Sequence, residues 1–229
     1  MDLIIIPGLG ENEKAFSHQI SYLTELAPVS VFNYDAYDSI DAMVAALIDQ
    51  LPDNCILAGH SLGGHIAMLA AAQSNISKLI IMNSWAQTTD QFRQQYQMAI
   101  DALNSVGLET LLKSQIPLLM HPDRASDTAL IDQTYQMLAE KSPETYLRFF
   151  QALTKAGDLD NILPQIKAPT LVIHGRQDPL FSLKQHQFIA DKIPKAQLAI
   201  IEDCGHNAPT EQPVATTALM RLSISSGCC

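Results

Sequence analysis

The chain has 229 residues, 47% of them hydrophobic, and a formal net charge of −10 at pH 7. This size and composition suit a single domain with a buried core and disfavour disorder. No run rich in Lys or Arg occurs, which argues against a nucleic-acid or membrane-surface partner. No stretch approaches the roughly 20 apolar residues of a membrane span, and the N-terminus lacks a signal-peptide pattern. Four cysteines without framework or zinc spacing fit a reducing compartment, so the expected location is cytoplasmic.

Six short apolar runs predict the strands of a parallel sheet. Each run is rich in aliphatic or β-branched residues and is bounded by Pro, Gly, Asp or Asn, as in strands buried on both faces. In chain order they are residues 3–6, 29–33, 55–58, 79–82, 170–174 and 197–202. Helical periodicity separates the first five runs. The expected fold is therefore α/β, with about six parallel strands and helices on both faces.

One long interval interrupts this alternation. Residues 85–167 contain no strand candidate, and their patterns predict helices near 90–104, 108–114, 127–141 and 143–156. We interpret this interval as a helical lid inserted after the fourth strand. The predicted division is a core of residues 1–84 and 168–223, a lid of residues 85–167, and a flexible tail of residues 224–229 that includes Cys228-Cys229.

The strongest chemical motif is Gly59-His60-Ser61-Leu62-Gly63, which stands between a predicted strand and a predicted helix. This is the context of a nucleophile elbow, in which a sharp turn exposes the serine hydroxyl. The two glycines allow the backbone to turn tightly, and the helix N-terminus favours negative charge beside the serine. The motif therefore predicts Ser61 as a nucleophile.

A serine nucleophile needs a base, and the base needs a carboxylate that orients it. His206 follows the last predicted strand and Asp178 follows the fifth, so both should leave the sheet at the same edge as Ser61. The order serine, acid, histidine is that of an α/β-hydrolase triad. The backbone amides of Leu62 and Leu9 are the expected donors to an oxyanion.

Four motifs, in the same order along the chain, resemble the α/β-hydrolase superfamily, from about residue 3 to residue 213. They are Pro7-Gly8, Gly59-His60-Ser61-Leu62-Gly63-Gly64, His174-Gly175-Arg176-Gln177-Asp178 and Asp203-Cys204-Gly205-His206. Residues 118–124 further resemble a compact bacterial subgroup with a helical lid. The chain departs from the family in having Pro7 where many relatives carry His, and it begins at what would be the family's third strand.

Together, the triad and the resemblance predict a serine hydrolase that cleaves a carboxylic ester of a small or medium, mainly apolar substrate. The expected pocket residues are Gly8, Trp85, Arg124, Phe150 and Phe181. No metal-ligand cluster, dinucleotide motif or phosphate loop is present, so neither metal nor cofactor is expected. The expected partner is a small-molecule substrate, and the protein is expected to be a monomer or homodimer.

Two alternative functions fit the same sequence. The triad also serves carbon–carbon bond hydrolysis and thioester cleavage, and a diketone substrate would require polar residues such as Arg124 or Asn83 opposite Ser61. A hydrolase fold can also act as a non-catalytic ligand-binding or sensor protein. Labelling of Ser61 by a fluorophosphonate distinguishes that second alternative from an enzyme.

Overall fold

The computed structural model describes residues 1–225, and its centre is a six-stranded sheet in which all neighbours are parallel. The strand order is β2-β1-β3-β4-β5-β6. The strands are β1 Leu3–Ile6, β2 Val29–Val31, β3 Ile56–His60, β4 Lys78–Met82, β5 Thr170–Gly175 and β6 Ala196–Ile201. Each lies within two residues of the predicted run at either end, which confirms the predicted sheet.

The three central strands explain why these runs are apolar without alternation. Every residue of β1, β3 and β4 is buried, because helices cover both faces of the sheet. Within β1, Ile4 and Ile6 belong to one hydrophobic cluster, while Leu3 and Ile5 belong to the cluster on the opposite face. The edge strands β2 and β6 are only partly buried.

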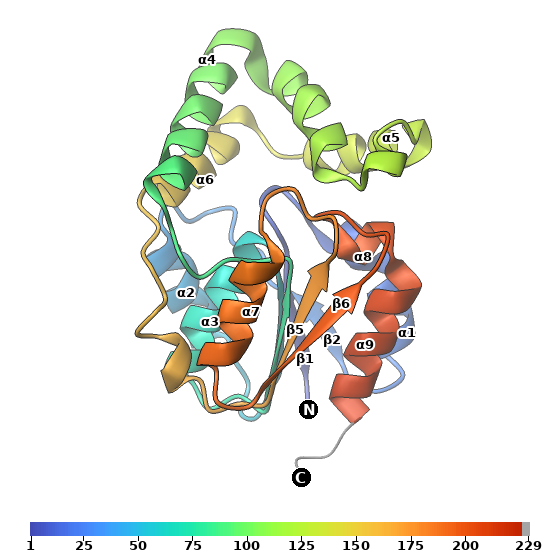
Figure 1. Cartoon of the computed structure of the whole chain (residues 1–229). Helices are drawn as coiled ribbons and strands as arrows, with labels where there is room; N and C mark the ends of the chain where they lie inside the picture. The colour runs from blue at the N-terminus through green and yellow to red at the C-terminus, as the bar shows by residue number, and fades with distance from the viewer. Residues whose placement is uncertain (226–229) are drawn as a thin grey trace.

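Helices from different parts of the chain form the two outer layers (Figure 1). Helices α2, α3 and α7 pack into one hydrophobic cluster, and α1 and α9 pack into the other. Their bounds are α1 Ser17–Leu23, α2 Ile40–Asp49, α3 Leu62–Gln73, α7 Leu183–Lys192, α8 Ala208–Glu211 and α9 Pro213–Ser225. Short 3₁₀ turns lie at Glu13–Phe16, Pro122–Arg124 and Leu163–Gln165.

The segment between β4 and β5 forms three helices that lie above the carboxyl ends of the strands (Figure 1). These lid helices are α4 Asp90–Leu119, α5 Thr128–Leu138 and α6 Pro143–Thr154. The two helices predicted at 90–104 and 108–114 are the arms of α4, which bends at Gly107 where φ is 81°. A non-glycine residue rarely adopts that φ, so glycine permits the bend.

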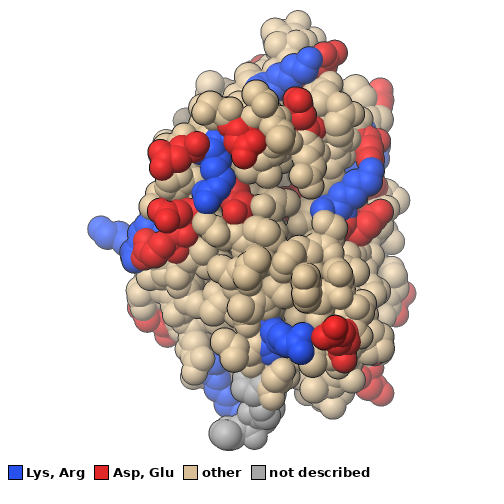
Figure 2. Space-filling view, turned by 90° about the vertical axis from the view of Figure 1, so that its right-hand side faces the viewer, with Lys and Arg blue, Asp and Glu red and all other residues tan. Residues whose placement is uncertain are grey.

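Two further features of the molecule are the charge distribution on one face (Figure 2) and the C-terminal helix α9. On the face shown in Figure 2, Lys and Arg lie beside Asp and Glu and do not gather in a basic patch. Within residues 1–225, no helix combines the length and apolarity of a transmembrane segment. Helix α9 continues through Ser225, so it includes the first two residues of the predicted tail. The Cys228-Cys229 pair lies outside the described residues.

Candidate functional site

Ser61 occupies a strained turn between β3 and α3. Its φ of 50° and ψ of −119° place it outside the regions that side-chain-bearing residues favour. A Cβ atom on Gly63 would lie 2.0 Å from the Ile6 carbonyl oxygen, and one on Gly59 would lie 2.3 Å from the Gly63 carbonyl oxygen. Only glycine fits at both positions. The turn therefore holds the Ser61 hydroxyl out at the carboxyl edge of the sheet.

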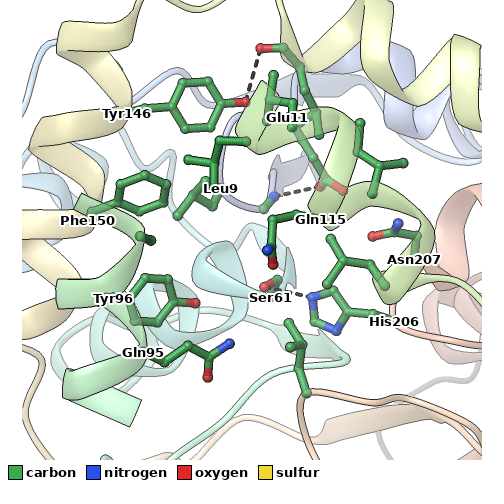
Figure 3. Close-up of a pocket in the computed structure, with 18 of the residues that line it drawn as sticks. Leu9, Glu11, Ser61, Gln95, Tyr96, Gln115, Tyr146, Phe150, His206 and Asn207 are labelled. Atoms are coloured by element: carbon green, nitrogen blue, oxygen red, sulfur yellow. Dashed lines mark hydrogen bonds between the residues drawn. The ribbon is translucent and has the colours of Figure 1, made fainter. Parts of the chain in front are cut away.

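The loops after β5 and β6 bring two further side chains to Ser61. The Nε2 atom of His206 lies 3.0 Å from Ser61 Oγ (Figure 3). The Nδ1 atom of His206 lies 3.1 and 3.0 Å from the two carboxylate oxygens of Asp178. The three side chains thus form one hydrogen-bonded chain, although 117 and 28 residues separate them along the sequence.

The Asp178 carboxylate is completely buried and fully hydrogen-bonded. It accepts hydrogen bonds from Asn83 Nδ2 at 2.8 Å and from the backbone amides of Leu180 and Phe181 at 2.8 and 3.2 Å. Burial by itself would raise the pKa of Asp178, but attraction to His206 and these hydrogen bonds outweigh it and lower the pKa to about 2. The ionised carboxylate accepts the Nδ1 proton of His206, which leaves Nε2 free to accept the Ser61 proton.

Asn83 and Glu11 are polar site residues to which the sequence analysis assigned no part in the triad. Asn83 follows β4 with a φ of 45°, and it orients Asp178. Glu11 accepts hydrogen bonds from the Gly8 amide at 2.7 Å and from His60 Nδ1 at 2.9 Å. An Asn directly after a central strand is a pattern that could have indicated a site residue. Glu11 lies in a loop whose sequence has no such pattern.

Glu11 and His60 form a buried pair beneath the site. Burial by itself would lower the pKa of His60, but the Glu11 carboxylate and the hydrogen bonds outweigh it and raise that pKa. The Nε2 atom of His60 donates to the carbonyl oxygen of His206 at 2.9 Å. The pair therefore connects the turn at Gly8 with the loop that carries His206.

Glu211 in α8 holds the other side of the His206 loop. Its buried carboxylate accepts the backbone amides of Gly205 at 3.2 Å, Asn207 at 3.1 Å and His121 at 2.7 Å. Two of these residues flank His206, and the third follows the end of α4. Glu211 thus joins the histidine loop to the lid helices, and the sequence analysis missed this residue.

A cavity of about 530 Å³ opens between the lid helices and the carboxyl edge of the sheet, a volume ordinary for small-molecule sites. Ser61, His206 and Leu9 line its floor, and α4 contributes much of its wall (Figure 3). Of the predicted pocket residues, Gly8 and Phe150 belong to this lining.

Three other predicted pocket residues lie elsewhere, which corrects that part of the sequence analysis. Trp85 and Phe181 are buried and stack on one another at 5.2 Å, and Phe181 also contacts the His206 ring edge-on at 5.5 Å. Arg124 Nη1 donates to the Asp203 carbonyl oxygen at 2.5 Å and lies 3.7 Å from Glu211 Oε2. The rings of Trp85 and Phe181 belong to the hydrophobic core. The Arg124 guanidinium connects the lid segment to the loop that carries His206.

The predicted oxyanion donors are placed as follows. Leu62 is the first residue of α3, where a backbone amide has no acceptor within its own helix. Leu9 lies in the loop after β1 and lines the cavity. Among the described residues, neither amide donates a hydrogen bond. Their role in binding an oxyanion stays a prediction.

One histidine cluster near the site has metal-like spacing. His174, Asp178 and His186 have potential ligand atoms within 4.8 Å of one another. However, His186 donates through Nδ1 to the Ser182 carbonyl, and its Nε2 accepts the Ser84 amide. Asp178 is engaged by His206. Of the three, only His174 has ring nitrogens without a hydrogen-bond partner, so the cluster offers one uncommitted ligand and not three.

The comparisons with known proteins concern the family and the fold. The model of the alpha/beta hydrolase fold family matches residues 3–213. "Putative carbamate hydrolase RutD" of Stutzerimonas stutzeri is 28% identical over 223 residues, which cover 89% of this chain and 84% of the relative. "3-oxoadipate enol-lactonase 2" of Acinetobacter baylyi is 25% identical, with 93% of this chain and 84% of the relative covered.

Solved structures share the architecture at low identity. The enol-lactonase from Burkholderia xenovorans has a TM-score of 0.88 and 20% identity, with 98% of this chain and 92% of that chain covered. An esterase from Thermogutta terrifontis has a TM-score of 0.85 and 22% identity, with 97% and 88% covered. These structures support the fold alone, whereas the family model spans most of the sequence. The chain belongs to the α/β hydrolase fold family.

Proposed function

We propose that this protein is a serine hydrolase that cleaves carboxylic esters of small or medium, mainly apolar substrates. The observation that carries the proposal is the hydrogen-bonded chain from Ser61 through His206 to the buried Asp178. The largely apolar lining of the adjacent cavity supports the substrate class. Relatives named as a carbamate hydrolase and an enol-lactonase support hydrolysis at an acyl carbon.

The proposed reaction has two halves. In the first, His206 accepts the proton of Ser61 as the hydroxyl attacks the ester carbonyl, and the Leu9 and Leu62 amides stabilise the oxyanion. His206 then gives the proton to the departing alcohol, which leaves an acyl group on Ser61. In the second half, His206 activates a water that releases the acid. Asp178 stabilises the charged imidazole in both halves.

The test combines turnover and covalent labelling. Wild-type protein is expected to hydrolyse 4-nitrophenyl acetate and butyrate and to be labelled by a fluorophosphonate, whereas Ser61→Ala should do neither and should retain the wild-type melting temperature. Ser105→Ala, at an exposed serine in α4, is the matched control and should behave as wild type. Turnover by Ser61→Ala at the wild-type rate would refute the proposal.

The same assay separates the alternatives. Acyl-CoA thioesters and dienoic diketones are offered beside the esters at equal concentration. Higher kcat/KM on either compound would replace ester hydrolysis by thioester or carbon–carbon bond cleavage with the same nucleophile. A folded wild-type protein that is not labelled and turns over none of the substrates would instead be a ligand-binding protein.

A further inference from the structure

The cavity above Ser61 has an enclosed part and an open part. Buried side chains line the enclosed part, and they include Leu112, Ile116, Leu138, Tyr146 and Phe150. Exposed amide side chains border solvent along the open part, and all of them come from α4: Gln91, Gln94, Gln95 and Gln115. A ligand that fills the cavity therefore meets buried, mostly apolar side chains and, toward solvent, neutral amide groups. Figure 3 shows Leu9, Phe150 and Gln95 among the side chains around Ser61.

The enclosed part offers little hydrogen bonding to a ligand. The Tyr146 hydroxyl donates to the Leu138 carbonyl at 3.0 Å, and the Thr134 hydroxyl donates to the Leu130 carbonyl at 2.8 Å. Tyr96 retains a free hydroxyl, and burial raises its pKa so that it stays neutral. A charged group in this part of the cavity would lose its water without regaining equivalent partners.

The cavity also lacks a cation for an anionic substrate. No Lys or Arg is found among the described residues that line it. Its full charges apart from the catalytic chain are those of Glu11 and His60, which pair with one another at 2.9 Å. Arg124, the cation expected there from the sequence, is held outside by Glu211 and the Asp203 carbonyl.

The order of the proposed reaction decides which half of the ester lies in each part. The alcohol leaves before water attacks, so it must have a path to solvent and belongs on the open side. The acyl group stays bonded to Ser61 through both halves and can remain enclosed. The acyl group therefore meets the apolar wall formed by α4, α5 and α6.

We infer that the site selects esters whose acyl group is uncharged and ends in an apolar terminus, and that it rejects acyl groups ending in a carboxylate. This inference rests on the proposed function and narrows its substrate class. The physical cause is the desolvation of a carboxylate against buried side chains that supply no cation and few donors.

Three 4-nitrophenyl esters of matched acyl length test the inference: the hexanoate, the adipic acid monoester and the adipic acid monoamide ester. We expect kcat/KM for the hexanoate to exceed that for the adipate by about 100-fold, with the neutral amide between them. A ratio below about 30 would overturn the inference. Equal rejection of the amide and the carboxylate would also overturn it, because polarity rather than charge would then determine selection.

A cation placed in the wall provides the converse test. Leu112→Lys should raise kcat/KM for the adipate ester at least about tenfold relative to the hexanoate, whereas Leu112→Met, an uncharged control of similar size, should leave the ratio unchanged. If Leu112→Lys does not fold, Tyr96→Lys makes the same test at a partly buried position in the enclosed part. An unchanged ratio in the folded lysine variant would overturn the inference.

The two proposals fail in distinguishable ways. If wild-type protein hydrolyses none of the three esters, the proposed ester hydrolysis is wrong. If it hydrolyses the adipate and hexanoate esters equally, and Ser61→Ala hydrolyses neither, ester hydrolysis stands and only the charge selection is wrong.

Discussion

The catalytic edge of the sheet and the lid above it are built by different means. At the edge, buried polar groups form specific hydrogen bonds, as the four partners of Asp178 show: His206, Asn83, Leu180 and Phe181. The lid wall consists mainly of apolar side chains and of amide side chains that border solvent. We therefore propose that the edge performs the chemistry through fixed geometry, while the lid selects substrates by the shape and polarity of the cavity wall.

The largest expected effect is that of Asp178→Asn at the edge. Asparagine retains the shape but can donate to His206 Nδ1, which favours the tautomer that presents a proton to Ser61 instead of accepting one. We expect kcat/KM for 4-nitrophenyl butyrate to fall about 10³- to 10⁴-fold, as for the equivalent change in other serine triads. Asp191→Asn, at an exposed position of α7, is the control, and steady-state kinetics provide the measurement. A fall of less than tenfold would contradict the role of Asp178.

Glu211 joins the two regions, so its removal should affect both. Glu211→Ala leaves three backbone amides without their buried acceptor, and each loss costs about 1–3 kcal/mol. We expect a fall of at least about 3 kcal/mol in the free energy of unfolding, measured by urea denaturation.

A separate readout tests whether Glu211 also positions His206. In Glu211→Ala that remains folded, kcat should fall by more than KM rises, because the histidine loop loses its position while the cavity wall remains. Arg124→Met is the matched control, since it removes the guanidinium beside Glu211 but keeps all three amide bonds; its effect should be smaller. If both variants lowered kcat equally, the position of His206 would depend on the Arg124–Glu211 ion pair and not on the amide bonds of Glu211.

The difference between edge and lid also explains what the sequence could predict. Ser61 lies in a local motif whose glycines are required by backbone contacts, and parallel strands bring the loops after β5 and β6 to the same edge. The sheet could therefore be predicted from its apolar runs, Ser61 from its motif, and His206 and Asp178 from their positions directly after predicted strands. The lid wall depends on how α4 bends and rotates, which helical periodicity does not determine.

The mispredicted pocket residues follow from that limit. Trp85 and Phe181 lie near the edge in sequence, but their rings turn into the core and stack there. Glu211 could not be recognised because its partners are backbone amides, two in the loop that carries His206 and one just after α4. A carboxylate acting on the main chain leaves no side-chain pattern in the sequence.

Buried neutral histidines beneath the edge predict sensitivity to acid. Burial lowers the pKa values of His65 and His186 to about 4, against about 6.5 in an unfolded chain. Below pH 6.5 the unfolded state binds protons that the folded state excludes, so the free energy of unfolding falls as the pH drops toward 4. Each histidine contributes up to about 3 kcal/mol to this loss.

Urea denaturation at pH 7.5 and pH 5 measures the effect. His186→Gln should be less stable than wild type at pH 7.5 but should lose less stability between the two pH values. His60 has the opposite sign, because its raised pKa contributes stability below pH 6.5 that is lost as the pH rises through the folded value. If His186→Gln lost as much stability between pH 7.5 and pH 5 as wild type does, the assignment of a neutral His186 would be wrong.

The smallest expected effect is that of Gly107→Ala in α4. The same change from glycine to alanine cannot be accommodated at Gly63. Gly63→Ala would place a methyl group against the Ile6 carbonyl, whereas an alanine Cβ at Gly107 would meet no atom within 4 Å. Gly107→Ala costs only backbone strain at φ 81°, about 1–3 kcal/mol. Because the arms of α4 on either side of Gly107 both line the cavity, straightening them should lower kcat/KM for 4-nitrophenyl hexanoate more than for the acetate. An equal fall in kcat/KM for both esters would mean that the bend in α4 also supports the triad residues. The proposed division, with chemistry at the sheet edge and substrate selection by the lid helices, would then be wrong.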